Sequence, residues 1–109
     1  MASKLLFMLG LCRKAGSVVI GTDLVTKSLP SKKIKLVIYT ADASANTEKK
    51  ITDKCRFYGV ECIKCTHTGQ EVSDAIGKAS SVCVLGITDI NFSNELKTLT
   101  FGGNEYGKN

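Results

Sequence analysis

Hydrophobic residues near the start of the chain recur at helical spacing. Leu5, Leu9 and Cys12 lie three or four residues apart, as residues on one face of a helix do, so we predict a helix over residues 3–14. The β-branched run at 17–20 follows it and has the composition of a short strand. The chain therefore opens with a helix that leads into a strand.

A glycine separates this strand from a second helical pattern. Gly21 permits a sharp turn, and Thr22 or Asp23 is the expected N-cap of the helix that follows. Pro30 marks the end of that helix, because proline cannot continue the hydrogen-bond ladder. The residues expected on its buried face are Leu24, Val25, Ser28 and Leu29.

The remainder of the chain keeps alternating between strands and helices. Residues 34–40 are almost continuously apolar, which is typical of a strand covered on both faces. Further strands are predicted over 60–65 and 82–86, and further helices over 42–58, 68–77 and from about residue 89. This order predicts an α/β fold, a three-layer α/β/α sandwich around a four-stranded mixed sheet.

The composition fits one domain. The chain has 109 residues, of which 43% are hydrophobic and 23% are charged, with one proline and no tryptophan. A chain of this length can bury a sufficient core without disulfides. We predict a single domain over residues 1–100 and a flexible tail, rich in glycine and asparagine, over residues 101–109.

The first residues and the cysteines indicate a reducing compartment. The apolar opening at 5–11 is interrupted by Cys12, Arg13 and Lys14 before it resembles a signal peptide. No segment of the sequence has the roughly 20 apolar residues that a membrane-spanning helix needs. We expect a cytoplasmic protein that makes no membrane contact and whose five cysteines are reduced.

The basic charge is concentrated in the first third of the chain. The formal net charge is +5, yet residues 1–35 alone carry seven basic residues against one acidic residue, and residues 36–109 carry eight against nine. Such a concentration of charge is the electrostatic footprint of a protein that binds phosphates. Ordinary solubilising surface charge is the alternative explanation.

The cysteines and the single histidine are the other candidates for chemistry. The four residues Cys55, Cys62, Cys65 and His67 match the number of ligands in a zinc site. Cys62 and Cys65, however, are three residues apart on a predicted strand and point to opposite faces, so they can share an ion only if the strand breaks between them. The sequence contains no P-loop, nucleophile elbow or dinucleotide-binding glycine motif. We predict no enzyme, no metal and no cofactor, with a metal or redox module on Cys62 and Cys65 as an alternative.

The third predicted helix carries alternating charges. Its basic residues Lys49, Lys50, Lys54 and Arg56 alternate with Glu48 and Asp53. This pattern is typical of a solvated helix face with ion pairs three or four residues apart.

Residues spread over almost the whole predicted domain carry a resemblance. They are Leu9-Gly10-Leu11, Arg13-Lys14-Ala15-Gly16, Gly21-Thr22 with Lys27, Lys35-Leu36-Val37, Asp42-Ala43-Ser44, Asn46-Thr47, Lys49-Lys50, Asp53-Lys54-Cys55, Tyr58, Ala75-Ile76-Gly77-Lys78 and Thr88-Asp89. In this order and spacing the chain resembles the ribosomal-protein family that binds kink-turn RNA, the group of large-subunit proteins seven-Ae and thirty-e, and most closely its small bacterial branch.

The resemblance implies a non-enzymatic RNA-binding role. In that family the glycine-led start of the second helix reads tandem sheared G·A pairs in a kinked stem, and the loop before the fourth strand packs on an extruded nucleotide. Those regions correspond here to residues 21–27 and 78–81. The residues that we expect to contact RNA are Arg13, Lys14, Gly21, Thr22, Asp23, Lys27, Lys32, Lys33, Lys78, Ala79 and Ser80.

The centre of the motif departs from the family pattern. Well-characterised binders carry Asn-Glu after the glycine-led pair, where this chain has Asp23 and Leu24. Asp23 can accept hydrogen bonds from a base but can donate none. Leu24 can form no hydrogen bond with a base, and we expect it to turn into the core. Each lost base contact costs about 1–3 kcal/mol. We predict a structured RNA partner, a kink-turn in a ribosomal or other non-coding RNA, and a monomer in its absence. A protein-interaction adaptor without specific RNA binding is the alternative.

Overall fold

Four short strands form one mixed sheet in the computed structural model, which describes residues 3–101. The strands are β1 (Val18–Ile20), β2 (Leu36–Tyr39), β3 (Glu61–Lys64) and β4 (Val84–Ile87), and their order in the sheet is β1-β4-β2-β3. β2 and β3 are parallel, whereas β4 runs antiparallel to both β1 and β2. The predicted four-stranded mixed sheet is therefore confirmed.

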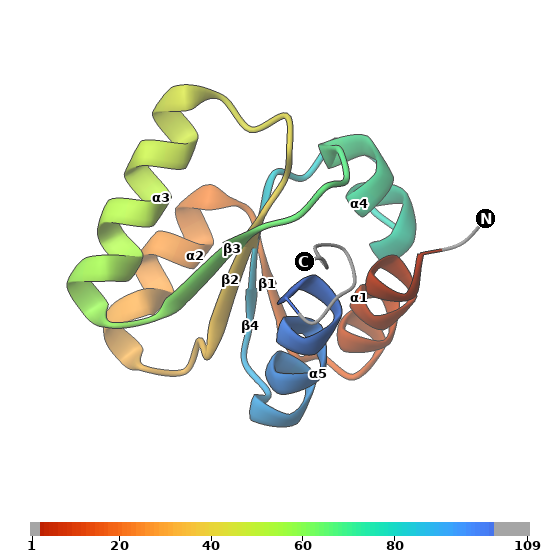
Figure 1. The fold of residues 1–109 in the computed structure, drawn as a ribbon, viewed down its shortest axis with the longest axis horizontal. Coiled ribbons are helices and arrows are strands. Elements are labelled where there is room, and N and C mark those ends of the chain that lie inside the picture. Colours follow the sequence, from red (N-terminus) through yellow and green to blue (C-terminus); the bar gives the residue numbers. More distant parts are fainter. Residues whose placement is uncertain (1–2, 102–109) are drawn as a thin grey trace.

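Helices cover both faces of this sheet (Figure 1). One layer contains α2 (Thr22–Ser28), the short 3-10 helix η1 (Leu29–Ser31) and α3 (Ala45–Tyr58). The other contains α1 (Lys4–Lys14), α4 (Gly69–Ile76) and α5 (Ile90–Phe101). The predicted α/β/α sandwich is confirmed. Among the helices that the structure describes, none combines the length and apolar character needed to cross a bilayer.

The alternation of side chains along β2 divides the core into two parts. Leu36 and Ile38 face the layer of α1, α4 and α5, where they join Leu9. Val37 faces the opposite layer and packs with Ile51. All five residues are at most 1% exposed, and each buried side chain of this size contributes about 1.5–3 kcal/mol. The two hydrophobic clusters hold the loops at both ends of the sheet in place.

The helices begin and end at capping residues. Ser44 accepts a hydrogen bond from the Thr47 amide at the start of α3, and Thr68 forms a capping box with Glu71 at the start of α4. Asp89 accepts from two amides in the first turn of α5. These starts lie within a few residues of the predicted ones, because capping residues are a strong sequence signal.

Element ends differ from the predictions by a few residues. The strand predicted over 34–40 is reduced to 36–39, although Ile34 and Thr40 are also buried. Hydrogen bonds from the Lys35 amide to Ile87 and from the Thr40 amide to Cys83 extend the contact between β2 and β4 by one residue beyond each end of the assigned strand. Phe101, the first residue of the predicted tail, ends α5, and the rest of that tail lies outside the described residues.

Candidate nucleic-acid interface

The second helix begins at a glycine. Gly21 is the N-cap of α2, with φ 101° and ψ 149°, a backbone region that is essentially restricted to glycine. No side chain caps this helix, so the prediction that Thr22 or Asp23 would do so is wrong. Both residues lie in the first turn instead, where the helix leaves its backbone amides without intrahelical acceptors.

Leu24 lies on the outside of α2. We expected it in the core, but it is 57% exposed, whereas Val25 and Leu29 are buried. With 3.6 residues per turn, Asp23, Leu24 and Lys27 fall within an arc of about 100°. These three residues form the outer face of α2, so the outer face presents an acid, an apolar side chain and a lysine to any ligand.

The loop after α4 reaches the same edge of the sheet as the start of α2. The Gly21 amide donates a 2.9 Å hydrogen bond to the carbonyl of Val84, the first residue of β4. Lys78, Ala79 and Ser80, which precede β4, are all exposed. The start of α2 is therefore joined to the strand that follows the 78–81 loop, although 50 residues of the chain lie between residues 21–27 and 78–81.

The loop at 78–81 is held against the start of α4. Val82 donates a hydrogen bond of 3.1 Å to the carbonyl of Gly69. A Cβ atom at Gly69 would collide with Oγ of Ser81 and would lie 3.2 Å from the carbonyl oxygen of Val82. The absence of a side chain at Gly69 therefore allows this close approach.

Asp42 links two further loops at this edge, a role that the sequence analysis missed. Its Oδ1 accepts from the Thr40 hydroxyl at 2.8 Å and from the Gly69 amide at 2.9 Å. These two hydrogen bonds lower the pKa of the Asp42 carboxyl. Asp42 thus joins the loop after β2 to the start of α4. A sequence signal for this contact does not exist, because Asp42 and Gly69 are distant in the chain.

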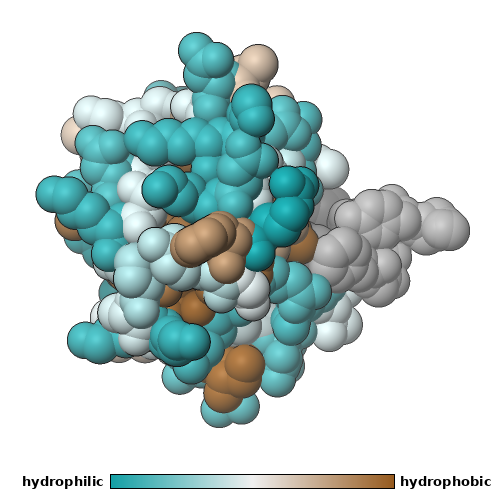
Figure 2. All heavy atoms as spheres, turned by 90° about the vertical axis from the view of Figure 1, so that its left-hand side faces the viewer, coloured by the Kyte–Doolittle hydropathy of each residue, from teal (hydrophilic) through white to brown (hydrophobic). Residues whose placement is uncertain are grey.

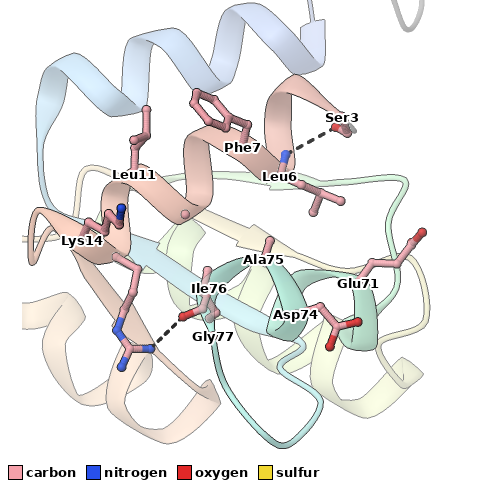
Figure 3. Close-up of a pocket in the computed structure, with 12 residues that line it drawn as sticks. Ser3, Leu6, Phe7, Leu11, Lys14, Glu71, Asp74, Ala75, Ile76 and Gly77 are labelled. Atoms are coloured by element: carbon pink, nitrogen blue, oxygen red, sulfur yellow. Dashed lines mark hydrogen bonds between the residues drawn. The ribbon is translucent and has the colours of Figure 1, made fainter. Parts of the chain in front are cut away.

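Arg13 joins α1 to the beginning of the 78–81 loop. Its guanidinium Nη1 donates to the carbonyl of Ile76 at 3.2 Å, one residue before Gly77 ends α4 (Figure 3). A cation is favourable at this position because the end of a helix carries partial negative charge. Lys14 and Gly77 line the same end of the groove between α1 and α4. Arg13 and Lys14 therefore lie beside the loop that contains Lys78.

The groove between α1 and α4 has a volume of about 720 Å³. Gly10 brings the two helices together, since a Cβ atom there would lie 3.0 Å from the carbonyl oxygen of Ala75. Figure 3 shows Glu71 and Asp74 at the opposite end of the groove from Lys14. The basic end of the groove is therefore the end that adjoins the loop at 78–81.

Lys32 and Lys33 lie elsewhere. They follow η1, beyond the C-terminal end of α2. Two residues after Lys33, the amide of Lys35 donates a hydrogen bond to the carbonyl of Ile87, the last residue of β4. Gly21, in contrast, bonds to Val84 at the near end. The structure does not bring Lys32 and Lys33 together with the start of α2.

The cysteines lie on both faces of the sheet. Cys65 packs in the cluster beneath α1, α4 and α5, whereas Cys62 packs in the other cluster with Cys55. A hydrogen bond with Cys55, together with burial, raises the pKa of the Cys62 thiol. Within the described part of the chain, no three His, Cys, Asp or Glu side chains are grouped as metal ligands.

The fold and the clustered segments define a known class of protein. The model of the ribosomal protein L7Ae/L30e/S12e/Gadd45 family matches residues 3–97, and the chain belongs to this family. The resemblance that the sequence motifs indicated is confirmed.

Two bacterial RNA-binding proteins are similar to this chain in sequence. The chain is 44% identical over 92 residues to the RNA-binding protein YlxQ of Bacillus subtilis (strain 168), a match that covers 84% of this chain and 90% of that protein. It is 34% identical over 99 residues to the RNA-binding protein YlxQ of Enterococcus faecium, covering 91% and 93% respectively. These names agree with the prediction of a binding protein rather than an enzyme.

Solved structures share the fold. A protein of unknown function from Bacillus halodurans has a TM-score of 0.85 and 33% identity, with 91% of this chain and 98% of that chain covered. A 15.5 kDa RNA-binding protein from Giardia lamblia has a TM-score of 0.75 and 18% identity, with 94% and 92% covered. At 18% identity, the similarity to the Giardia lamblia protein shows a shared fold alone.

Proposed function

We propose that this protein binds structured RNA and recognises a kink-turn or a similar bent stem. The membership of the family and the names of the bacterial relatives support an RNA partner. The observation that carries the kink-turn proposal is the hydrogen bond between Gly21 and Val84, which joins the start of α2 to the strand that follows residues 78–81. Residues 21–27 and 78–81 are the two regions that the family resemblance assigns to the RNA.

The residues at this edge have complementary roles in the proposal. Gly21 has no side chain, so the backbone at the start of α2 can approach the RNA closely. Lys27, Arg13, Lys14 and Lys78 provide positive charge for phosphates, and phosphate contacts position a protein on nucleic acid. Base contacts provide specificity. Here Asp23 can accept a hydrogen bond from the amino edge of a guanine, and Leu24 can offer only an apolar contact.

A gel-shift comparison tests the proposal. One probe is a kink-turn stem, and the other is the same stem with its G·A pairs replaced by Watson–Crick pairs. At physiological salt we expect the kink-turn to bind at least about tenfold more tightly, the equivalent of one good base contact. Equal affinity for the two stems would leave only nonspecific electrostatic binding and would refute kink-turn recognition.

The exposed position of Leu24 gives the alternative function its support, because an apolar side chain there also suits a protein partner. In that alternative the protein is an interaction adaptor on the same fold. Purification of the tagged protein from cells, with and without ribonuclease, separates the two functions. Partners that remain after digestion support the adaptor, whereas partners lost on digestion support RNA binding.

The proposal also includes a cytoplasmic location and a monomeric state in the absence of RNA. All five cysteines are free thiols in the structure, which supports a cytoplasmic location. The large apolar side chains that are exposed in the described residues are spread over α1, α2, α3 and α5, and such scattered residues support a monomer in the absence of RNA. Light scattering after size exclusion measures the molar mass, and a dimer mass would contradict the monomer.

A further inference from the structure

A second surface with basic and aromatic character lies where α3 ends and η1 turns into β2. We call it the aromatic–lysine surface, and its members are Lys32, Lys35, Lys50, Lys54, Phe57 and Tyr58. Figure 2 shows the side of the molecule that carries α3, where hydrophilic side chains surround isolated hydrophobic ones. None of these residues belongs to the edge that contains Gly21.

Two aromatic rings stand out on this surface. Phe57 is 80% exposed and Tyr58 is 37% exposed, and their ring centroids are 4.9 Å apart at an interplanar angle of 89°. Among the residues of α3 only Ile51 and Cys55 are buried. An edge-to-face pair uses the face of one ring and the edge of the other, so ring surface remains open to a third flat group.

The two rings and the lysines form one continuous surface. A hollow of about 410 Å³ is lined by Lys50, Lys54, Phe57 and Tyr58. A second hollow of about 280 Å³ is lined by Lys32, Lys35 and again Tyr58. Because Tyr58 lines both hollows, a single extended ligand can run from α3 across Tyr58 to the turn after η1.

The charge of this surface is positive. Asp53, the acid that lines the first hollow, is paired with Lys49 at 2.9 Å and with Arg56 at 3.5 Å. In the described part of the chain no carboxylate lies within ion-pair distance of Lys50 or Lys54. The ion pairs expected three or four residues apart therefore form at Lys49 and Arg56 but not at these two lysines.

We propose that the aromatic–lysine surface binds single-stranded RNA, with a base stacked on Phe57 and the neighbouring phosphates held by the lysines. Exposed aromatic rings set among cations are the usual means of binding single strands, since every base has a flat face and every linkage has a charge. A protein partner matches the charge of the four lysines only if it carries acidic groups arranged to face them. A nucleic-acid strand supplies a negative charge at each step without any such arrangement.

This surface and the kink-turn site are distinct. The two are separated by α2 and η1, ten residues that extend from Gly21 at one edge of the sheet to Lys32 beyond the other end. The proposal concerns single strands in their own right, and it does not require the kink-turn assignment to be correct. One RNA with a bent stem and an unpaired extension could occupy both places.

Fluorescence anisotropy with a labelled 12-nucleotide oligouridine tests the proposal. We expect Phe57→Ala to weaken binding at least about fivefold, because a stacked base contributes about 1 kcal/mol or more. Phe57→Trp should retain affinity, since it keeps a larger ring, and Phe57→Leu should behave like alanine. At 80% exposure the Phe57 side chain contributes little to folding, and circular dichroism verifies that each variant is folded.

Matched lysine variants complete the design. Lys54→Ala should weaken oligouridine binding and reduce its salt dependence, whereas Lys4→Ala, an exposed lysine at the start of α1, should change neither. Oligouridine affinity that is unchanged in Phe57→Ala, or equal losses in Lys4→Ala and Lys54→Ala, would overturn the proposal. A blunt kink-turn stem, tested in parallel, should bind Phe57→Ala normally, so failure of one site is distinguishable from failure of the other.

Discussion

The amide of Gly21 donates a hydrogen bond of 2.9 Å to the carbonyl oxygen of Val84. This contact continues the antiparallel pairing of β1 with β4, in which Ile20 lies opposite Leu85. It joins the first turn of α2 to the end of the segment that carries Lys78. The start of α2 and the strand that follows the 78–81 loop are thus joined at one end of the sheet.

The backbone conformation of Gly21 gives the first prediction. Its φ of 101° and ψ of 149° strain any other residue, so Gly21→Ala should destabilise the fold by about 1–3 kcal/mol and weaken RNA binding. Urea denaturation and gel shifts measure the two effects. Gly16→Ala is the matched control, because Gly16 also has a positive φ, of 72°, but lies before β1. Gly16→Ala should lower the free energy of unfolding but weaken RNA binding less than Gly21→Ala does. Equal losses of binding in the two variants would contradict a special role for Gly21.

The outer face of α2 gives the second prediction. The double substitution Asp23→Asn and Leu24→Glu restores the residues of well-characterised kink-turn binders, and it replaces side chains that are exposed. We expect it to leave the free energy of unfolding within about 0.5 kcal/mol, as surface changes usually do, and to tighten kink-turn binding by about tenfold or more. The same variant should gain nothing on a stem without G·A pairs. A gain on both stems would indicate a change in general affinity rather than in base reading.

The position of Lys27 on the outer face of α2 gives the third prediction. Lys27→Ala should weaken binding to a blunt kink-turn stem and lower the salt dependence of log K by about 0.9, the equivalent of one lost phosphate contact. Lys33→Ala removes the same charge after η1, away from the outer face of α2, and should leave both quantities unchanged. Titrations between 50 and 200 mM salt measure the slopes. Equal effects of the two substitutions would mean that total charge, not the position of Lys27, determines binding.

The hydrogen bonds of Asp42 give the fourth prediction, which concerns pH. Its pKa is lower in the folded protein than the value of about 3.9 expected when unfolded, because the Thr40 hydroxyl and the Gly69 amide donate to the charged carboxylate. The stabilisation of the folded state by the charged Asp42 carboxylate is fully present above about pH 4. It is lost as the pH falls through the pKa that Asp42 has in the folded protein. Asp42→Asn keeps an acceptor without the charge.

Chemical denaturation from pH 6 to pH 3 checks this expectation. At pH 6 the wild type should be more stable than Asp42→Asn, and the difference in unfolding free energy should shrink as the pH approaches 3. A difference that stays constant over this range would show that the charge of Asp42 is not involved. Protection of the Gly69 amide from hydrogen exchange should fall over the same range.

The sequence predicts the fold well because its signals are local. Apolar runs, capping residues and glycines recur at regular distances, so the order of helices and strands and the mixed sheet follow from them. The position of β4 between β1 and β2 does not follow, since pairing depends on contacts between distant residues. Asp42 bonding to Gly69 is another contact of that kind.

The errors at the candidate site have physical causes. Leu24 and Val25 are adjacent apolar residues in a helix of seven, which is too short for its periodicity to decide which one faces inward. The N-cap was assigned to Thr22 or Asp23 on propensity, but the unusual backbone of Gly21 takes that position. Lys32 and Lys33 are close to Lys27 in sequence but follow η1, so they lie away from the start of α2, and their contact with RNA stays a prediction.

The central position of β4 also determines when the site can exist. Among the strands of the described residues, β1 pairs with β4 alone, and β4 is the last strand to be synthesised. A nascent chain that ends before residue 84 can form α1 and α2, but the amide of Gly21 has no carbonyl to bind and β1 has no neighbour. The proposed RNA site at this edge is therefore complete only once the residues of β4 have been synthesised.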